Sequence, residues 1–265
     1  MSKKIHFVII DFFKAERVID VVKSINNQNY DNHKIFISVI DNSCSEGNYR
    51  TLEKGLTGLA SLIKSTDNIG YTKAANKAVS ECEWEADIIC LLNPDIIFED
   101  VNTLNFMMDN FDDPKCLIVG PAQSNDDGSE PDIVRNYPSA LALVLKRSPF
   151  RKAPVAARIV DSYLLPNFDS SKRQNAPWLQ SSCIFIQKSF WDSIGGLNTK
   201  YFLFMSDIEI CKKAYEKGGY VLYDPAVRVI ADGKRCSEGG ISSLFKSPAM
   251  RHHVKDAIKY YLGGS

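Results

Sequence analysis

The stretch "ADIICLLNPDIIFED" (residues 86–100) decides the fold. Residues 86–92 end in an apolar run, which predicts a short strand that is buried on both faces, as in a parallel sheet. An Asn-Pro-Asp corner follows directly. The chain is expected to turn at Pro94, because proline has no backbone N–H for a sheet ladder. Asp95 is then left at the tip of a buried strand.

Strand-like and helix-like segments alternate outward from this stretch. Apolar runs at 5–10, 34–43, 61–66, 86–92 and 116–121 alternate with helical patterns at 15–28, 47–56, 71–84 and 101–112. This alternation predicts an α/β fold, with a mostly parallel sheet that is covered by helices on both faces.

Acidic residues follow three of the predicted strands. Asp11, Asp41 and Asp95 each fall at a strand end, and ligands of such sheets bind at the carboxyl ends of the strands. One such acid is explained equally well as a turn former or a helix cap. Three acids at one edge indicate a site.

The second half of the chain changes character. Residues 122–176 are rich in turn residues and include the basic stretch "KRSPFRKAPVAAR", which predicts a long excursion or a mobile loop of the kind that covers a substrate. Order is expected to resume with a strand, a short helix and a Gly-Gly turn at 177–198. A helix at 205–219, one or two strands at 220–232 and an amphipathic helix at 247–264 follow.

Composition narrows the class of protein. The 265 residues include 32 Lys+Arg and 32 Asp+Glu, and a net charge of zero argues against a general nucleic-acid binder. Seven cysteines are scattered without a CxxC pair, which is typical of reduced, buried thiols in a cytosolic protein. The N-terminus lacks the features of a signal peptide, and no stretch approaches the ~20 apolar residues of a spanning helix. A cytoplasmic protein is expected.

Six segments, taken in order, resemble a known family. They are "FVIIDFF", "VIDNSCSE", "DNIGYTKAANKAV", "LLNPDIIFED", "SSCIFIQKSFWDSIGGLNTKYFLFMSDIEICKKAYEKGG" and "YDPAVRVIADG". Together they resemble the family 2 glycosyltransferases, and within them the rhamnosyltransferase-like branch that builds bacterial surface polysaccharides. The resemblance implies a GT-A fold: a domain over 1–245, with a nucleotide-sugar-binding half (1–121) and an acceptor-binding, catalytic half (122–245), followed by a C-terminal helix (246–265).

The resemblance also implies a donor site. Many GT-A enzymes bind Mg²⁺ or Mn²⁺ through a DxD motif, and "NPD" stands in its place here, so that Asp95 would hold the metal and Asn93 would support the turn or the sugar. Asp41 would accept a hydrogen bond from N3–H of a uracil or thymine ring. The loop and helix that close over the nucleotide would contribute Asn68, Gly70, Lys73 and Asn76.

The catalytic base implied by the resemblance lies in "FMSDIEIC". Asp207 falls on the base position of the family, although Ser206 replaces the acid that usually precedes it. A helix cap is the structural alternative for Asp207. Glu209 is expected to shape the site or bind the acceptor. Trp178 would stack on an acceptor sugar, with a place in the core as the alternative.

One segment departs from the family pattern. Many relatives have a histidine after the last sheet strand, but "VIADGKRCSEGG" has none. Asp232 is expected to take its place as a metal ligand, and Lys234 or Arg235 to meet the diphosphate. Weak metal binding, or loss of activity, is the alternative consequence of this departure.

The leading hypothesis is an inverting, metal-dependent glycosyltransferase. It would move L-rhamnose from dTDP-rhamnose to a hydroxyl of a lipid-linked glycan, in the synthesis of O-antigen lipopolysaccharide or capsule. Donors such as UDP-galactose or UDP-GlcNAc remain open, as does a non-catalytic sugar-nucleotide or glycan-binding module of a larger synthase. The basic C-terminal helix would contact the inner membrane, pack on its own domain or lead into another domain or subunit.

Overall fold

The computed structural model describes residues 2–30, 33–232 and 248–263. Within them the chain builds a nine-stranded sheet in which β8 (Gln174–Asn175) pairs with β11 and the other strands form one path. The path runs in the order β3 (Ser61–Lys64), β2 (Lys34–Asp41), β1 (Lys4–Asp11), β4 (Ile88–Leu92), β10 (Cys183–Gln187), β6 (Cys116–Asn125), β11 (Tyr220–Ala231) and β5 (Ile96–Ile97).

Strand directions confirm the expected mostly parallel sheet. β3, β2, β1 and β4 run parallel to their neighbours, and β6 is parallel to β11. β10 is antiparallel to both β4 and β6, and β5 is antiparallel to β11. Because Cys183 of β10 lies opposite Leu92 of β4, the chain before β10 lies at the carboxyl edge of the parallel strands.

Two layers of helices cover the two faces of the sheet. On one face pack α1 (Ala15–Asn26), α2 (Glu46–Leu56) and α4 (Thr103–Asp109), which continues as the 3₁₀ turn η1 (Asn110–Asp112). On the other pack α3 (Tyr71–Ser80), α7 (Lys188–Ser193) and α8 (Ser206–Glu216).

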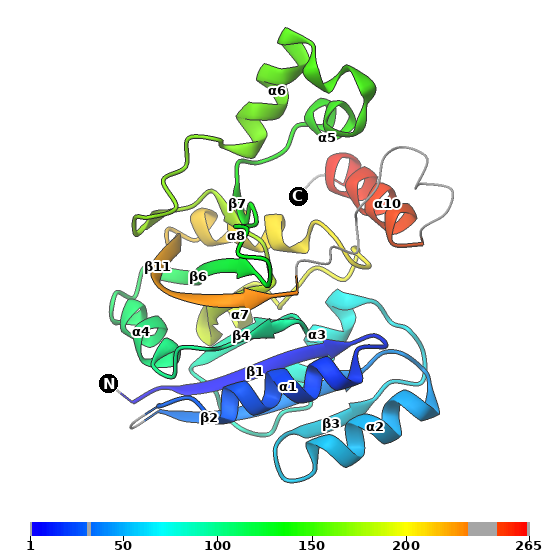
Figure 1. Ribbon diagram of the computed structural model, residues 1–265, viewed down its shortest axis with the longest axis vertical. Helices are drawn as coiled ribbons and strands as arrows, with labels where there is room; N and C mark the ends of the chain where they lie inside the picture. Colours follow the sequence, from blue (N-terminus) through cyan, green and yellow to red (C-terminus); the bar gives the residue numbers. More distant parts are fainter. Residues whose placement is uncertain (1, 31–32, 233–247, 264–265) are drawn as a thin grey trace.

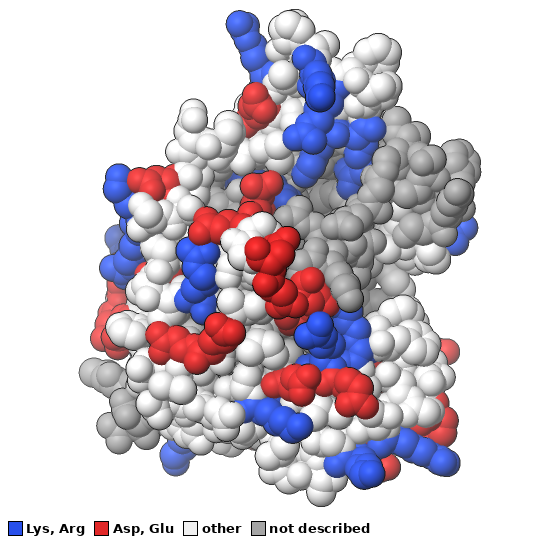
Figure 2. Space-filling view, in the orientation of Figure 1, with Lys and Arg blue, Asp and Glu red and all other residues white. Residues whose placement is uncertain are grey.

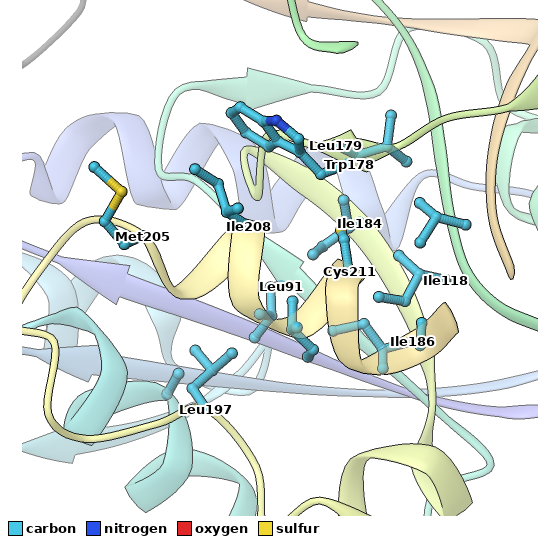
Figure 3. Close-up of a cluster of buried hydrophobic side chains, with 14 of the residues drawn as sticks. Leu91, Ile118, Trp178, Leu179, Ile184, Ile186, Leu197, Met205, Ile208 and Cys211 are labelled. Atoms are coloured by element: carbon cyan, nitrogen blue, oxygen red, sulfur yellow. The ribbon is translucent and has the colours of Figure 1, made fainter. Parts of the chain in front are cut away.

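Alternating side chains of single strands feed both cores. In β1, Phe7 and Ile9 join the α1 side while Val8 and Ile10 join the α8 side. Figure 3 shows how Ile208 and Cys211 of α8 face the strand residue Ile184. Each such buried side chain contributes about 1.5–3 kcal/mol to the stability of the folded state. The carboxyl edge of the sheet is therefore held in place by a packed core on both faces.

Residues 122–176 contain regular helices and a short strand, so of the two alternatives predicted for them the long excursion agrees with the structure and the irregular loop does not. They include β7 (Val134–Arg135), α5 (Ala140–Arg147), the 3₁₀ turn η2 (Pro149–Lys152) and α6 (Pro154–Leu164). Pro149 begins η2 and Pro154 begins α6, and at a helix start a missing N–H costs no hydrogen bond. Ser139 caps α5 by accepting the N–H of Ala142. Figure 1 shows α5 and α6 together at one end of the molecule, beside α10 (Pro248–Leu262).

The C-terminal helix packs on its own domain. Met250 and Asp256 of α10 are buried, and the hydroxyl of Tyr261 donates to the carbonyl of Pro138 at 2.6 Å. This confirms the helix and agrees with the packed alternative. None of the helices within the described ranges is long and apolar enough to cross a bilayer. Four described cysteines, at positions 90, 116, 183 and 211, are buried free thiols, while Cys236 lies outside the described residues.

Candidate active site

Two acids face each other across β1 and β2. Asp11 and Asp41 are register partners, and both are buried. The amide of Asn48 donates to Asp11 Oδ2 at 2.5 Å and to Asp41 Oδ1 at 3.1 Å, and Ser43 N adds a bond to Asp41 at 3.0 Å. Burial raises the pKa of Asp11. The hydrogen bond from Asn48 opposes this rise, and the charge of Asp41 adds to it. The network fixes the Asp41 carboxylate at the carboxyl end of β2.

The loop that contains Asn68 and Gly70 is held against the strand ends. Asn42 Nδ2 donates to Asn68 Oδ1 at 3.0 Å, and Ile69 N donates to Asn42 Oδ1 at 3.0 Å. Gly70 has φ +78, and a Cβ there would lie 2.6 Å from the carbonyl oxygen of Phe202. Tyr71 N donates to that same oxygen at 2.7 Å. Only glycine fits this close approach, which joins the loop to the segment before α8.

The Asn-Pro-Asp corner is a hydrogen-bonded turn between β4 and β5. Asn93 N donates to Ser182 O at 2.8 Å, and Ile96 N donates back to Asn93 O at 3.3 Å, as in a β-turn. Asp95 occupies the third position of the turn. The sequence prediction that the chain turns at Pro94 is therefore confirmed, and the turn directs Asp95 toward the end of β11.

Asp95 and Asp232 meet at the same ammonium group. Lys14 Nζ lies 4.0 Å from Asp95 Oδ1 and 3.8 Å from Asp232 Oδ2. Burial raises the pKa of Asp95 to about 6; Lys14 opposes this rise, and the neighbouring Asp232 adds to it. Two neighbouring carboxylates that contact the same ammonium group repel each other when both are ionised, so a cation beside them is favourable.

The donor set suits a hard divalent ion. Carboxylate oxygens are the ligands that Mg²⁺ and Mn²⁺ prefer, and Mg²⁺ commonly takes one or two carboxylates together with substrate phosphates and water. No group of three or more His, Cys, Asp or Glu within the described ranges could hold a metal ion. Asp95 and Asp232 therefore form a partial site, which fits an ion that is shared with a diphosphate.

Asp207 is the second residue of α8. The residue before the helix, Met205, has φ +70 and makes no side-chain cap, so Asp207 is not the helix cap. Its Oδ1 accepts the N–H of Ile208 at 2.9 Å. Burial raises the pKa of Asp207 to about 6, against the opposing effects of the Ile208 N–H and the Arg135 charge. A carboxylate with a pKa near neutrality is suited to general base catalysis.

The surroundings of Asp207 connect it with the other acids. The backbone of Ser181 lies close enough to Asp207 to lower its pKa, and the carbonyl of Ser182 accepts the N–H of Asn93 from the Asn-Pro-Asp turn. Burial raises the pKa of the Tyr71 hydroxyl, and the charge of Asp207 adds to it. Tyr71 follows Gly70 directly. Neighbouring contacts thus link the loops that carry Asp41, Asp95 and Asp207 along one edge of the sheet.

Arg135 of β7 is a further residue whose charge acts on Asp207, and no sequence motif pointed to it. Its guanidinium lies 5.9 Å from the ring centroid of Tyr163 and 5.8 Å from that of Trp178. Such cation–π contacts orient a guanidinium without neutralising it. Trp178 belongs to the short strand β9 (Trp178–Leu179), which pairs with β7, and this pairing places Arg135 next to Asp207.

Asp256 of α10 anchors the segment that leads into Asp207. Its buried carboxylate accepts the N–H groups of Phe202, Leu203 and Phe204 at 2.9–3.1 Å. The ring of His252 stacks on Phe202 at 4.0 Å. The sequence did not single out Asp256, because its partners lie 52–54 positions away.

Two expected site residues make contacts within the protein. The Asn76 amide bonds to both backbone groups of Leu197, at 2.8 and 2.9 Å, and it lines a cavity of about 710 Å³ that also contacts His6 and Trp84. Trp178 is buried, and its indole N–H donates to Asn136 O at 2.8 Å. Asn76 therefore ties α3 to the loop between α7 and α8, and Trp178 supports Arg135 instead of offering a free ring face to a sugar.

The remaining candidates are placed as follows. Glu209 receives hydrogen bonds from Tyr201 and Asn198, and its pKa is lowered by these and by Lys200 against the effect of burial. It thus shapes the loop before α8. Lys73 is exposed in the first turn of α3. Lys234 and Arg235 lie outside the described residues.

Comparisons with known proteins place this architecture. No protein-family model matches the chain. It is 23% identical over 187 residues to the N-acetylglucosaminyl-diphospho-decaprenol L-rhamnosyltransferase of Mycobacterium tuberculosis, a match that covers 64% of this chain and 57% of that protein. The chain thus spans little more than half of this curated relative.

Solved structures share the fold. The mannosyltransferase PcManGT of Pyrobaculum calidifontis, in complex with GDP-Man and Mn²⁺, has a TM-score of 0.66 at 16% identity. The match covers 100% of this chain and 66% of the mannosyltransferase chain. GalNAc-T7 with UDP, GalNAc and Mn²⁺ has a TM-score of 0.63 at 14% identity, covering 96% and 48%. TarS of S. aureus has a TM-score of 0.59 at 11% identity, covering 86% and 60%. The chain therefore has the GT-A fold and is rhamnosyltransferase-like in sequence, which confirms the resemblance to the family 2 glycosyltransferases.

Proposed function

We propose that this chain is an inverting glycosyltransferase that transfers a sugar from a nucleotide donor to a glycan hydroxyl. One observation carries the proposal: the segments that hold Asp41, Asp95 and Asp207 are linked step by step, through the loop of Asn68 and Gly70 and through Ser181 and Ser182, along one edge of the sheet, with the pKa of Asp207 raised to about 6. In this proposal Asp41 accepts a hydrogen bond from the pyrimidine, Asp95 is a metal ligand and Asp207 is the base.

The nucleotide half, residues 1–121, holds the donor. Asp41 accepts N3–H of a uracil or thymine ring, and the loop of Asn68 and Gly70 forms the adjacent wall. Lys73, exposed at the start of α3, is placed to meet phosphate oxygens. Thymine and uracil both present this N3–H group, so Asp41 suits dTDP-sugars and UDP-sugars alike.

Asp95 and Asp232 are the residues that would hold a divalent metal. When bound, Mg²⁺ or Mn²⁺ supplies positive charge against the diphosphate leaving group. Lys14, which now lies within 4.0 Å of both carboxylates, is a second cation at the same place. We infer that it can turn from the carboxylates to the phosphate oxygens when a donor binds.

Asp207 acts as the general base. It takes the proton of the acceptor hydroxyl, whose oxygen forms the new bond to the anomeric carbon. The bond from that carbon to the phosphate oxygen breaks, and the nucleoside diphosphate leaves with the electron pair. Attack on the face opposite the leaving group inverts the anomeric configuration. Glu209 and the Asp256 contacts keep Asp207 in position.

The donor and acceptor are proposed from the relative's name. That relative is an L-rhamnosyltransferase acting on a diphospho-decaprenol-linked sugar, so we propose L-rhamnose from dTDP-rhamnose and a lipid-linked acceptor bound by residues 122–245. The pathway would be synthesis of an O-antigen or capsule on the cytoplasmic face of the inner membrane, together with other domains or subunits of a polysaccharide synthase.

A donor panel tests the proposal. Purified protein is incubated with dTDP-rhamnose, UDP-galactose or UDP-GlcNAc and an extracted lipid-linked glycan, with and without Mn²⁺, and released nucleotide is measured. We expect release with dTDP-rhamnose that requires acceptor and is lost in Asp207→Asn. Release only with a UDP-hexose would change the donor. Nucleotide binding without any turnover would support a non-catalytic module and overturn the enzyme.

A further inference from the structure

The outer faces of α5, η2 and α6 expose large apolar side chains. Leu141 is 54% exposed, Val144 63%, Phe150 70% and Val155 73%. The inner faces of the same helices are packed, with Ala142, Leu143 and Tyr163 buried in the core of the α8 side. The exposed set is therefore a separate outward face, which we call the hairpin face.

Basic side chains accompany these apolar residues. Arg151, Lys152 and Arg158 are exposed, and none of them has a carboxylate partner among the described ion pairs. Between residues 140 and 164 the sequence contains five Lys or Arg and one acid, Asp161 of α6. Figure 2 shows several Lys and Arg side chains gathered over the end of the molecule formed by α5 and α6. The hairpin face thus combines exposed apolar side chains with a net positive charge.

We propose that the hairpin face docks onto the surface of an anionic phospholipid membrane. Apolar side chains beside Lys and Arg are the combination by which short amphipathic helices lie in the interface of a bilayer. α5 and α6 have 8 and 11 residues, too short to span a bilayer, so they would lie along its surface. Phe150 and Val155 enter the headgroup boundary, while the three cations meet lipid phosphates.

Charge decides between this partner and a second copy of the chain. In a symmetric dimer the same patch faces itself, so Arg151, Lys152 and Arg158 would oppose their own copies, with Asp161 as the one acid of these helices to offset them. An anionic lipid surface neutralises all three cations. The four exposed apolar residues, in turn, have no use in binding a soluble polyanion.

The hairpin face is connected to the proposed base. Tyr163, on the inner side of α6, lies under the Arg135 guanidinium beside Asp207. Arg147 of α5 reaches His253 of α10 at 3.4 Å, and α10 holds the loop before Asp207 through Asp256. Docking through this face would bring the base to the depth at which a lipid-linked hydroxyl emerges. The inference deepens the proposed function, but its test needs neither donor nor acceptor.

Vesicle flotation with the full chain tests the proposal. Vesicles of phosphatidylcholine alone are compared with vesicles that also contain phosphatidylglycerol. We expect binding to the anionic vesicles that weakens with salt. The triple variant Arg151→Glu/Lys152→Glu/Arg158→Glu should lose about 100-fold in affinity, since each basic residue near an anionic surface contributes about fivefold. Phe150→Ser/Val155→Ser should lose about tenfold or more.

Matched variants elsewhere keep the test specific. Arg17→Glu/Lys23→Glu/Lys54→Glu changes the same charge on α1 and α2, and Leu59→Ser/Phe106→Ser removes two exposed apolar residues of other elements. Both should bind vesicles as the parent does, and circular dichroism verifies that every variant is folded. Failure of the parent to bind anionic vesicles, equal losses in the control variants, or a concentration-dependent dimer broken by Phe150→Ser/Val155→Ser would each overturn the proposal.

Discussion

Replacing Asp207 by asparagine should stabilise the protein while it removes the base. The folded environment raises the pKa of Asp207 from 3.8 to about 6 because burial disfavours its charged form. At 1.36 kcal/mol for each pKa unit, the ionised carboxylate costs the folded state up to about 3 kcal/mol above pH 6. Because the residue is only partly buried, we expect a net gain of about 1–3 kcal/mol for Asp207→Asn at pH 8.

The stabilisation expected for Asp207→Asn depends on pH. A raised folded pKa means that the folded state binds the proton more tightly, so stability falls as pH rises from about 4 to about 6 and the penalty is complete above that. The advantage of the asparagine variant should therefore shrink by roughly half at pH 5. Urea unfolding of both proteins at pH 5 and pH 8 measures the difference.

A destabilised variant at pH 8 would refute this reasoning. That result would mean that the Asp207 carboxylate is a structural partner of Arg135 and not a strained base. Activity supplies the second readout: loss of a general base typically costs about 10²–10⁴-fold in rate, and the parent's rate should rise with pH through about 6 as Asp207 ionises. Full transfer by the asparagine variant would remove the assignment.

Three further substitutions test the supports of the site. Asp256→Ala should cost about 3–5 kcal/mol in the free energy of unfolding, because it strands three backbone N–H groups; a loss below about 1 kcal/mol in urea unfolding would contradict this. Gly70→Ala should cost about 1–3 kcal/mol and weaken dTDP binding in calorimetry, because its φ is +78 and Phe202 O blocks a Cβ. Gly58→Ala, with φ +74 but open space, should leave dTDP binding unchanged. Lys14→Ala should tighten Mn²⁺ binding to the nucleotide-free protein severalfold, since the ammonium competes for Asp95; weaker binding in calorimetry would oppose that view.

The strand ends and their acids follow closely from the sequence. Continuous apolar runs specify buried parallel strands, and Asp11, Asp41 and Asp95 fall where those runs stop, because a polar carboxyl is tolerated only at the edge. The turn at Pro94 follows from proline chemistry. In each case the deciding information lies within a few residues along the chain.

Residues that act across long sequence distances could not be predicted. Arg135 reaches Asp207 only because β7 pairs with β9, and Asp256 meets the loop before α8 only because α10 folds back on the domain. The α5–α6 hairpin was missed for a different reason. Its prolines indicate loops in isolation, yet both occupy first helical turns, where the missing N–H carries no cost.

Anomalous diffraction from crystals grown with dTDP and Mn²⁺ tests the central claim most directly. The claim is that Asp41, Asp95 and Asp207 have separate tasks at one edge of the sheet. We predict a manganese peak between the diphosphate and the carboxylates of Asp95 and Asp232, with thymine N3–H bonded to Asp41 and with Asp207 facing the space beyond the diphosphate. A thymine ring bound away from Asp41, or manganese bound without Asp95, would contradict it.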